Sequence, residues 1–108
     1  MSVSEIAELQ ALIRDFADRR DWHRFHNPKN LALALCGEAG ELAAELQWLT
    51  AEEASGLSGD ALIRLQQEAA DVAIYLLRLC DVAGIDLASS VREKLAINEI
   101  RFPAPSEG

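Results

Sequence analysis

Residues 60–83 read DALIRLQQEAADVAIYLLRLCDVA and contain neither glycine nor proline. Apolar side chains recur along this run every three or four positions, which is the spacing of one face of an α-helix. Gly84 follows directly, and glycine is the residue most typical of a helix C-terminus. The run therefore predicts one long helix from about Asp60 to Ala83.

Three further helices are predicted around this one. Asn27 followed by Pro28 is a typical helix start with Asn27 as the N-cap, and Asp86 can cap another helix. No proline occurs between Lys29 and Phe102, so this part of the chain is free to be helical. The expected helices lie at about residues 4–20, 28–49 and 87–101, and a loop is expected at residues 50–59, where Thr50 and Glu53 can cap a short helical turn.

No strand pattern or repeat interrupts these helices, so we expect an all-α fold with a four-helix bundle-like protomer. Pro103 and Pro105 prevent the last helix from continuing. One domain is therefore expected over residues 1–103, followed by a short mobile tail over residues 104–108.

The long helix is apolar on nearly every side between Val72 and Cys80. In a protein dissolved in water, such a helix has to contact more than one neighbouring layer. A chain of 108 residues has a small core of its own, so we expect a second subunit to cover part of this helix. The alternative is that the first and last helices enclose it completely within one chain.

The composition limits the classes of partner. The chain is half apolar, has a net charge of −8, and has no apolar run near the ~18 residues that a membrane span requires. Ten basic residues against eighteen acidic ones argue against nucleic acid as a partner. The first residues show no secretory leader and the two cysteines show no metal-ligand spacing, so a cytoplasmic protein with reduced thiols is expected.

Two pairs of carboxylates border the leucine stripes of the two central helices. Glu38 and Glu41 lie on the second predicted helix, and Glu68 and Asp71 lie on the third. Acidic residues three positions apart are routine on a solvated helix face. If these two helices pack antiparallel through their leucines, however, the four carboxylates converge, and they repel one another unless they are protonated or bridged by cations.

An all-oxygen ligand set favours a hard cation, so Mg²⁺ is expected and Mn²⁺ can substitute. A divalent cation also allows an acidic protein to hold a phosphorylated ligand. A di-iron centre of the ferritin type is disfavoured, because it needs Glu-x-x-His motifs and the only histidines, His23 and His26, lie apart from both carboxylate pairs.

Several segments resemble the MazG-like nucleoside triphosphate pyrophosphohydrolases, whose hallmark is an ExxE motif, a spacer and an ExxD motif. These segments are CGEAGEL at 36–42, QW at 47–48 and EAADV at 68–72. The small single-domain branch that includes the dCTP pyrophosphatases is also similar over further segments, and the match spans roughly residues 12–103. Those segments are RDW at 20–22, FHNPKNL at 25–31, DVAIYL at 71–76 and KLAIN at 94–98.

The resemblance implies an all-α enzyme, usually a tetramer built as a dimer of dimers. Such an enzyme hydrolyses (d)NTPs to the monophosphate and pyrophosphate with Mg²⁺ and removes surplus or modified nucleotides. It also implies that four residues ligate the metal and are central to catalysis: Glu38, Glu41, Glu68 and Asp71.

The resemblance further places Lys94 and Asn98 near the phosphates and sugar, with Arg101 a weaker match. It places four residues around the base: Trp22, His26, Trp48 and Tyr75. From the residues alone, a solvated helix face would explain Lys94 and Asn98. Core packing would likewise explain Trp22, and His26 could simply cap a turn. Ile13 stands where some dCTP-preferring members carry a histidine, so only a lean towards dCTP-type substrates is expected.

A different class of function is also compatible with the sequence. The chain could be a non-catalytic helical oligomerisation or regulatory module that keeps the acidic cluster as a structural cation site. Turnover of a nucleotide distinguishes the enzyme from this module.

Overall fold

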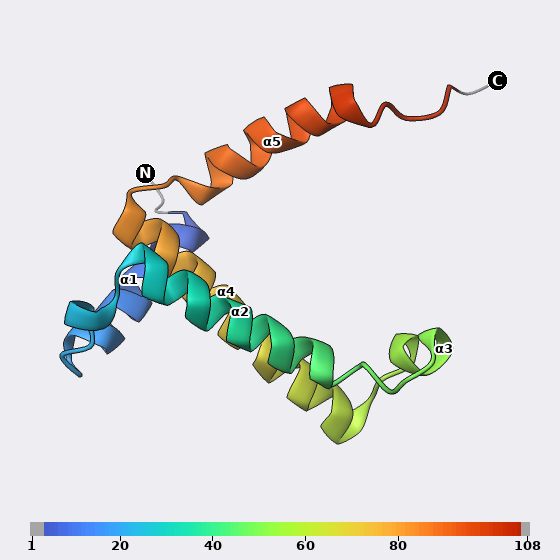
Figure 1. Ribbon diagram of the computed structural model, residues 1–108, viewed down its shortest axis with the longest axis horizontal. Coiled ribbons are helices and arrows are strands. Elements are labelled where there is room, and N and C mark those ends of the chain that lie inside the picture. Colours follow the sequence, from blue (N-terminus) through green and yellow to red (C-terminus); the bar gives the residue numbers. More distant parts are fainter. Residues whose placement is uncertain (1–3, 107–108) are drawn as a thin grey trace.

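The computed structural model describes residues 4–106, and within this range the chain is all-α, as predicted (Figure 1). None of its helices is both long and apolar enough to cross a membrane. In chain order the elements are α1 (Glu5–Asp18), the single 3-10 turn η1 (His23–Phe25), α2 (Pro28–Ala44), the short α3 (Ala51–Ser55), α4 (Gly59–Ala83) and α5 (Leu87–Arg101).

Local capping interactions determine where most of these helices begin and end. The Asn27 side chain accepts a hydrogen bond from the Asn30 backbone N–H at 2.9 Å, and Pro28 is the first residue of α2. Thr50 and Glu53 form a complete capping box on α3. Gly84 ends α4 in the left-handed conformation at φ 70°, where a side chain would be strained. These predicted helix boundaries are confirmed.

The predicted C-terminal end of α2 is wrong. The helix ends at Ala44 rather than near Leu49, and residues 45–49 form turns with i→i−3 hydrogen bonds such as Leu49 N–H to the Leu46 carbonyl at 3.0 Å. The physical reason is the backbone conformation of Thr50, the residue that follows these turns. Thr50 has an extended backbone (ψ 163°) because it caps α3, so the chain has to leave the α-helical path before it.

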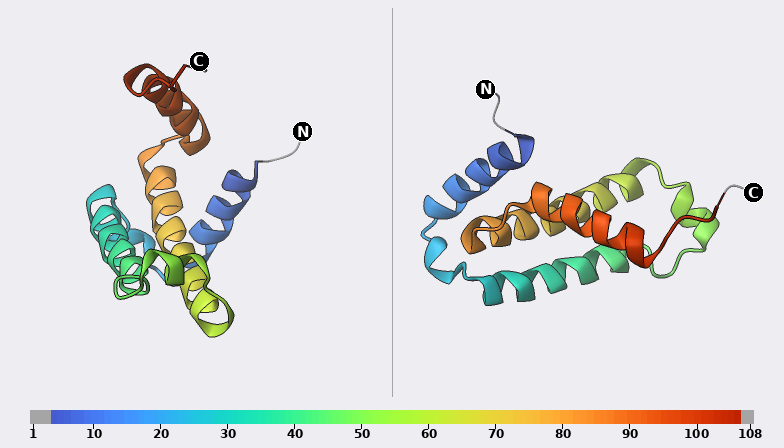
Figure 2. Two further views of the ribbon diagram at one scale, coloured as in Figure 1. Left: turned by 90° about the vertical axis from the view of Figure 1, so that its right-hand side faces the viewer. Right: turned by 90° about the horizontal axis from the view of Figure 1, so that it is seen from above.

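The core lies where α2 and α4 pack antiparallel, the most extensive helix pair in the molecule, and α1 crosses α4 beside them (Figures 1 and 2). Leu31 is the largest fully buried side chain, at 1 % exposure. Two polar links tie α1 to α4: Arg14 makes a bidentate ion pair with Asp81 at 2.9 Å, and the Gln10 side-chain amide donates to the Leu77 carbonyl.

The last long helix, α5, extends away from the other helices and makes no extensive contact with any of them within residues 4–106 (Figures 1 and 2). Ile63 and Ile74 on α4 remain about half exposed. The first and last helices therefore do not enclose α4 within one chain, and that alternative is excluded. Of the predicted tail, residues 104–106 are exposed and without regular structure, and residues 107–108 lie outside the described range.

Candidate metal and nucleotide site

The antiparallel pair brings three predicted metal ligands together. Glu38 from α2 and Glu68 and Asp71 from α4 each offer a carboxylate oxygen, and these three oxygens lie within 4.8 Å of one another. The leucines beside them produce this arrangement, because burying both leucine stripes turns the adjoining carboxylates towards the seam between the helices. Glu68 and Asp71 share one face of α4 because they are three residues apart.

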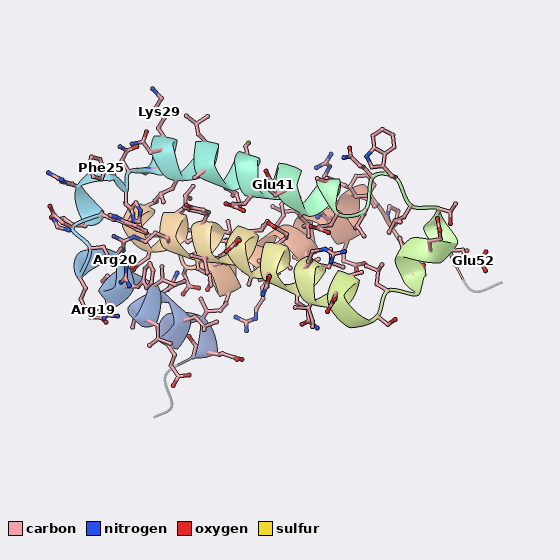
Figure 3. The ribbon with its side chains drawn as sticks, turned by 90° about the horizontal axis from the view of Figure 1, so that it is seen from below. Arg19, Arg20, Phe25, Lys29, Glu41 and Glu52 are labelled. Carbon is pink, nitrogen blue, oxygen red and sulfur yellow. The ribbon has the colours of Figure 1, made fainter. Side chains whose placement is uncertain are left out.

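The fourth predicted ligand, Glu41, lies outside this close group. Its side chain is exposed, one turn beyond Glu38 on α2 and alongside α4 (Figure 3). It is nevertheless near enough for its negative charge to act on Glu68. Glu45, one turn further along α2, is engaged by Arg64, whose Nε lies 3.2 Å from its carboxylate oxygen.

Electrostatic repulsion marks this cluster. Partial burial, followed by the negative charges of Glu38, Asp71, Glu41 and Glu45, raises the pKa of Glu68 above its usual value. Within residues 4–106, no lysine or arginine forms an ion pair with Glu38, Glu68 or Asp71. A hard divalent cation fits this all-carboxylate donor set and would relieve the repulsion.

A pocket of about 260 Å³ opens directly beside the cluster. Glu38 and Asp71 belong to both, so a molecule in the pocket lies next to the carboxylates. The other walls come mainly from α1, the turn before α2, and α4. The lining residues are Ile13, Phe16, Ala17, Trp22, His26, Glu38, Asp71, Ile74, Tyr75 and Arg78.

Three of the four predicted base-contacting residues line this pocket: Trp22, His26 and Tyr75. Trp22 packs edge-on to Phe16, with ring centroids 5.7 Å apart, and its ring lies 6.4 Å from that of His26. Flat rings of this kind stack well on a planar heterocycle. Trp48 does not line the pocket. It lies in the turns that follow the end of α2 at Ala44, and it is 86 % exposed.

Lys94 and Asn98 are not brought to the pocket within a single chain. Both lie on α5, which projects away from α1, α2 and α4 (Figure 1). In this respect the site built by one chain contains fewer residues than the resemblance implies.

Arg78 is the charged pocket residue that the sequence did not single out. It is only 6 % exposed, and its Nε donates a hydrogen bond to His26 Nδ1 at 3.0 Å. Burial, the charge of Arg78 and the charge of His23 together lower the pKa of His26. Its position in the sequence was a usable signal, since it is the one basic residue in the otherwise apolar segment from Val72 to Cys80.

The two halves of the site suit different chemical groups. Carboxylates with a bound cation can hold a polyphosphate, because the cation inverts the local sign of charge. The adjacent apolar pocket, with its aromatic rings and a histidine, suits a planar ring with a few polar atoms.

No family model matches the chain, but individual curated proteins and a solved structure do. The sequence is 44% identical over 101 residues to dCTP pyrophosphatase 1 of Homo sapiens, covering 92% of this chain and 59% of that protein. It is 37% identical over 100 residues to a dATP/dGTP diphosphohydrolase of Salmonella phage PMBT28, covering 28% of that protein. The chain thus spans less than two thirds of the length of these relatives.

Among solved structures, a pyrophosphatase from Archaeoglobus fulgidus is similar over nearly the whole of both molecules. The match has a TM-score of 0.84 and 36% sequence identity, and it covers 96% of this chain and 97% of the other.

Proposed function

The chain belongs to the family of MazG-like nucleotide pyrophosphohydrolases that includes the dCTP pyrophosphatases, and on this premise we propose that it hydrolyses nucleoside triphosphates to the monophosphate and pyrophosphate with Mg²⁺. One observation carries the proposal. The carboxylate cluster and the aromatic pocket share Glu38 and Asp71, so a nucleotide with its base in the pocket has its phosphates beside the cluster.

The residues divide into two tasks. Glu38, Glu68 and Asp71, joined by Glu41, hold the cation. Trp22, His26 and Tyr75 hold the base and so fix where the triphosphate lies. When bound, Mg²⁺ neutralises charge on the phosphoryl oxygens and makes water a better nucleophile. Hydrolysis adds one water across the anhydride between the α- and β-phosphates and releases two products.

A lean towards dCTP-type substrates is supported by the relatives named dCTP pyrophosphatase 1. Ile13 supplies only an apolar wall to the pocket, and the polar edge of a base has to be read by polar lining residues such as His26 and Tyr75. We place the protein's role in clearing surplus or modified deoxynucleotides in the cytoplasm, with small nucleotides rather than nucleic acids as its ligands.

The purified chain should convert dCTP to dCMP and pyrophosphate in equal amounts when Mg²⁺ is present, and EDTA should stop the reaction. Incubation with each dNTP and NTP, followed by separate detection of monophosphate, pyrophosphate and orthophosphate, measures both the reaction and the preferred base. Mn²⁺ should restore activity to the EDTA-treated protein. Release of orthophosphate, or no turnover of any triphosphate, would refute the assigned reaction.

We also propose that the chain is a homo-oligomer, with a tetramer as the expected state. The support comes from α5, which has apolar side chains on opposite faces, Val91 with Leu95 and Ile97 with Ile100, all of them substantially exposed in one chain. A helix apolar on two sides needs neighbours on both. A second copy seated on α5 would also place Lys94 and Asn98 within reach of a site.

Light scattering during gel filtration should therefore give about four times the chain mass of 11.8 kDa. Changing Ile100 to glutamate should lower this mass, because Ile100 is 84 % exposed in the single chain and a charge there leaves the protomer's own packing intact. Glu99→Gln, at the neighbouring exposed position, is the matched control and should keep the wild-type mass. A monomeric wild-type protein contradicts the proposal.

A further inference from the structure

Arg78 on α4 is the one buried charged residue within residues 4–106. Removing a guanidinium from water is costly unless its N–H groups are paired. No buried side-chain nitrogen or oxygen in the described part of the chain lacks a hydrogen-bond partner. The hydrogen-bond partners of Arg78 therefore indicate why this side chain is buried.

Asp81 is only a secondary partner of Arg78. Its carboxylate receives two 2.9 Å hydrogen bonds from Arg14, and the Arg14 hydrogen bond is the largest of the effects that lower the Asp81 pKa. Arg78 Nη1 lies further from this carboxylate, at 3.5 Å. The shorter hydrogen bond of Arg78, at 3.0 Å, goes to the His26 ring. The buried guanidinium is thus directed mainly at an imidazole.

This hydrogen bond determines which nitrogen of His26 carries the proton. A guanidinium in a protein is always protonated and can only donate. His26 Nδ1 must therefore accept, so the ring is neutral and its proton sits on Nε2. A doubly protonated ring would place an N–H against the N–H of Arg78. The lowered pKa of His26 agrees with a neutral ring.

The other ring nitrogen, Nε2, therefore carries a donor N–H, and it belongs to a residue that lines the pocket. His26 lines the pocket beside Trp22, and its Nε2 makes no hydrogen bond to any of residues 4–106. The nearby walls formed by Ile13, Phe16 and Ile74 are apolar. A donor of fixed identity in such a setting selects for an acceptor atom on the ligand.

We propose that Arg78 is a positioning residue for base recognition: it holds His26 with the proton on Nε2, so that the pocket offers a neutral donor to a carbonyl oxygen or ring nitrogen of the nucleobase. This inference rests on the proposed function for its ligand. The tautomer that it requires can be measured in the protein without a bound nucleotide.

The tautomer is tested by nitrogen NMR of ¹⁵N-labelled full-length protein at neutral pH. The chain has two histidines, and His23→Gln assigns their signals. We expect His26 to show a single Nε2-protonated ring in the wild type. Arg14→Gln is the matched control, since it also removes an arginine from Asp81 but leaves the Arg78 to His26 contact, and it should not change the tautomer. In Arg78→Met, His26 should lose its fixed tautomer.

The role in base recognition is tested by kinetics with two substrates. For dCTP, Arg78→Met should raise KM roughly tenfold with kcat changed less than about twofold, the scale of one neutral hydrogen bond. For an abasic deoxyribose triphosphate, the same variant should behave as the wild type does. Arg78→Lys keeps a cationic donor and should recover part of the dCTP affinity.

The outcomes separate this inference from the proposed function. A wild-type His26 protonated on Nδ1, or on both nitrogens, overturns the inference whether or not the protein hydrolyses dCTP. Equal losses of dCTP and abasic triphosphate hydrolysis in Arg78→Met would show a merely structural role. A protein with no turnover but the expected tautomer refutes the role in base recognition and the proposed function together.

Discussion

Asp71→Asn is expected to lower kcat for triphosphate hydrolysis at least about 100-fold, the scale seen when a group that stabilises transition-state charge is removed. The amide keeps the size of the side chain and removes the charge that holds the cation. Glu38→Gln and Glu68→Gln should have effects of the same order, because their oxygens lie in the same close group. Steady-state kinetics with saturating Mg²⁺ measures all three.

Glu52→Gln is the control for these variants, since it makes the same change of charge on α3, at the far end of the molecule from the N-terminal half of α2 (Figure 3). It should retain wild-type kcat. Circular dichroism and light scattering must show that the inactive variants keep their helices and oligomeric state. A fully active Asp71→Asn protein would remove the case for the carboxylate cluster as the catalytic centre, whereas a wild-type protein without turnover would favour a non-catalytic helical module.

Mg²⁺ is expected to stabilise the folded protein strongly. The three clustered carboxylates meet only in the folded state, so a cation at ~100 times its dissociation constant should raise the free energy of unfolding by about 2.7 kcal/mol. For a domain of this size, the melting temperature should rise on the order of 10 °C. Thermal melts in Mg²⁺ and in EDTA, with NaCl matching the ionic strength, measure the effect. Equal melting temperatures would contradict a site formed on folding.

The same cluster sets the direction of the pH dependence. The folded-state pKa of Glu68 is raised, so in EDTA the native protein binds a proton at Glu68 more readily than the unfolded chain does. This contribution to stability is present below the usual pKa and is lost as pH rises through the folded-state value. The gain from Mg²⁺ should therefore be largest at neutral pH and shrink on acidification. In EDTA at pH 7, Glu68→Gln should melt above the wild type.

The sequence predicted the helix boundaries that depend on local chemistry. Asn27, Thr50, Gly84 and Asp86 act within one turn of the helix they cap, so their meaning does not depend on the rest of the fold. The predicted end of α2 was wrong because no glycine or proline marks the place where the helix stops. It is set instead by the extended backbone that α3 requires at Thr50.

The sequence predicted only part of the geometry of the candidate site. The leucine stripes that pair α2 with α4 are visible in the sequence, and they were enough to bring Glu38, Glu68 and Asp71 together. The exact register of the pair is not visible, and it leaves Glu41 outside the close group. The Arg78 to His26 contact joins residues 52 positions apart, and sequence spacing alone could not predict it.

The arrangement of the helices divides the site between two separable pieces of scaffold. The acidic cluster sits on the closely packed α2 and α4, whereas the pocket wall carrying Ile13 and Phe16 belongs to α1, which Arg14 and Gln10 fasten to α4 by polar links. Substitutions on α1 can reshape this pocket wall without disturbing the carboxylate cluster. In a scaffold of this kind, the ligand preference of the pocket can change independently of the acidic centre.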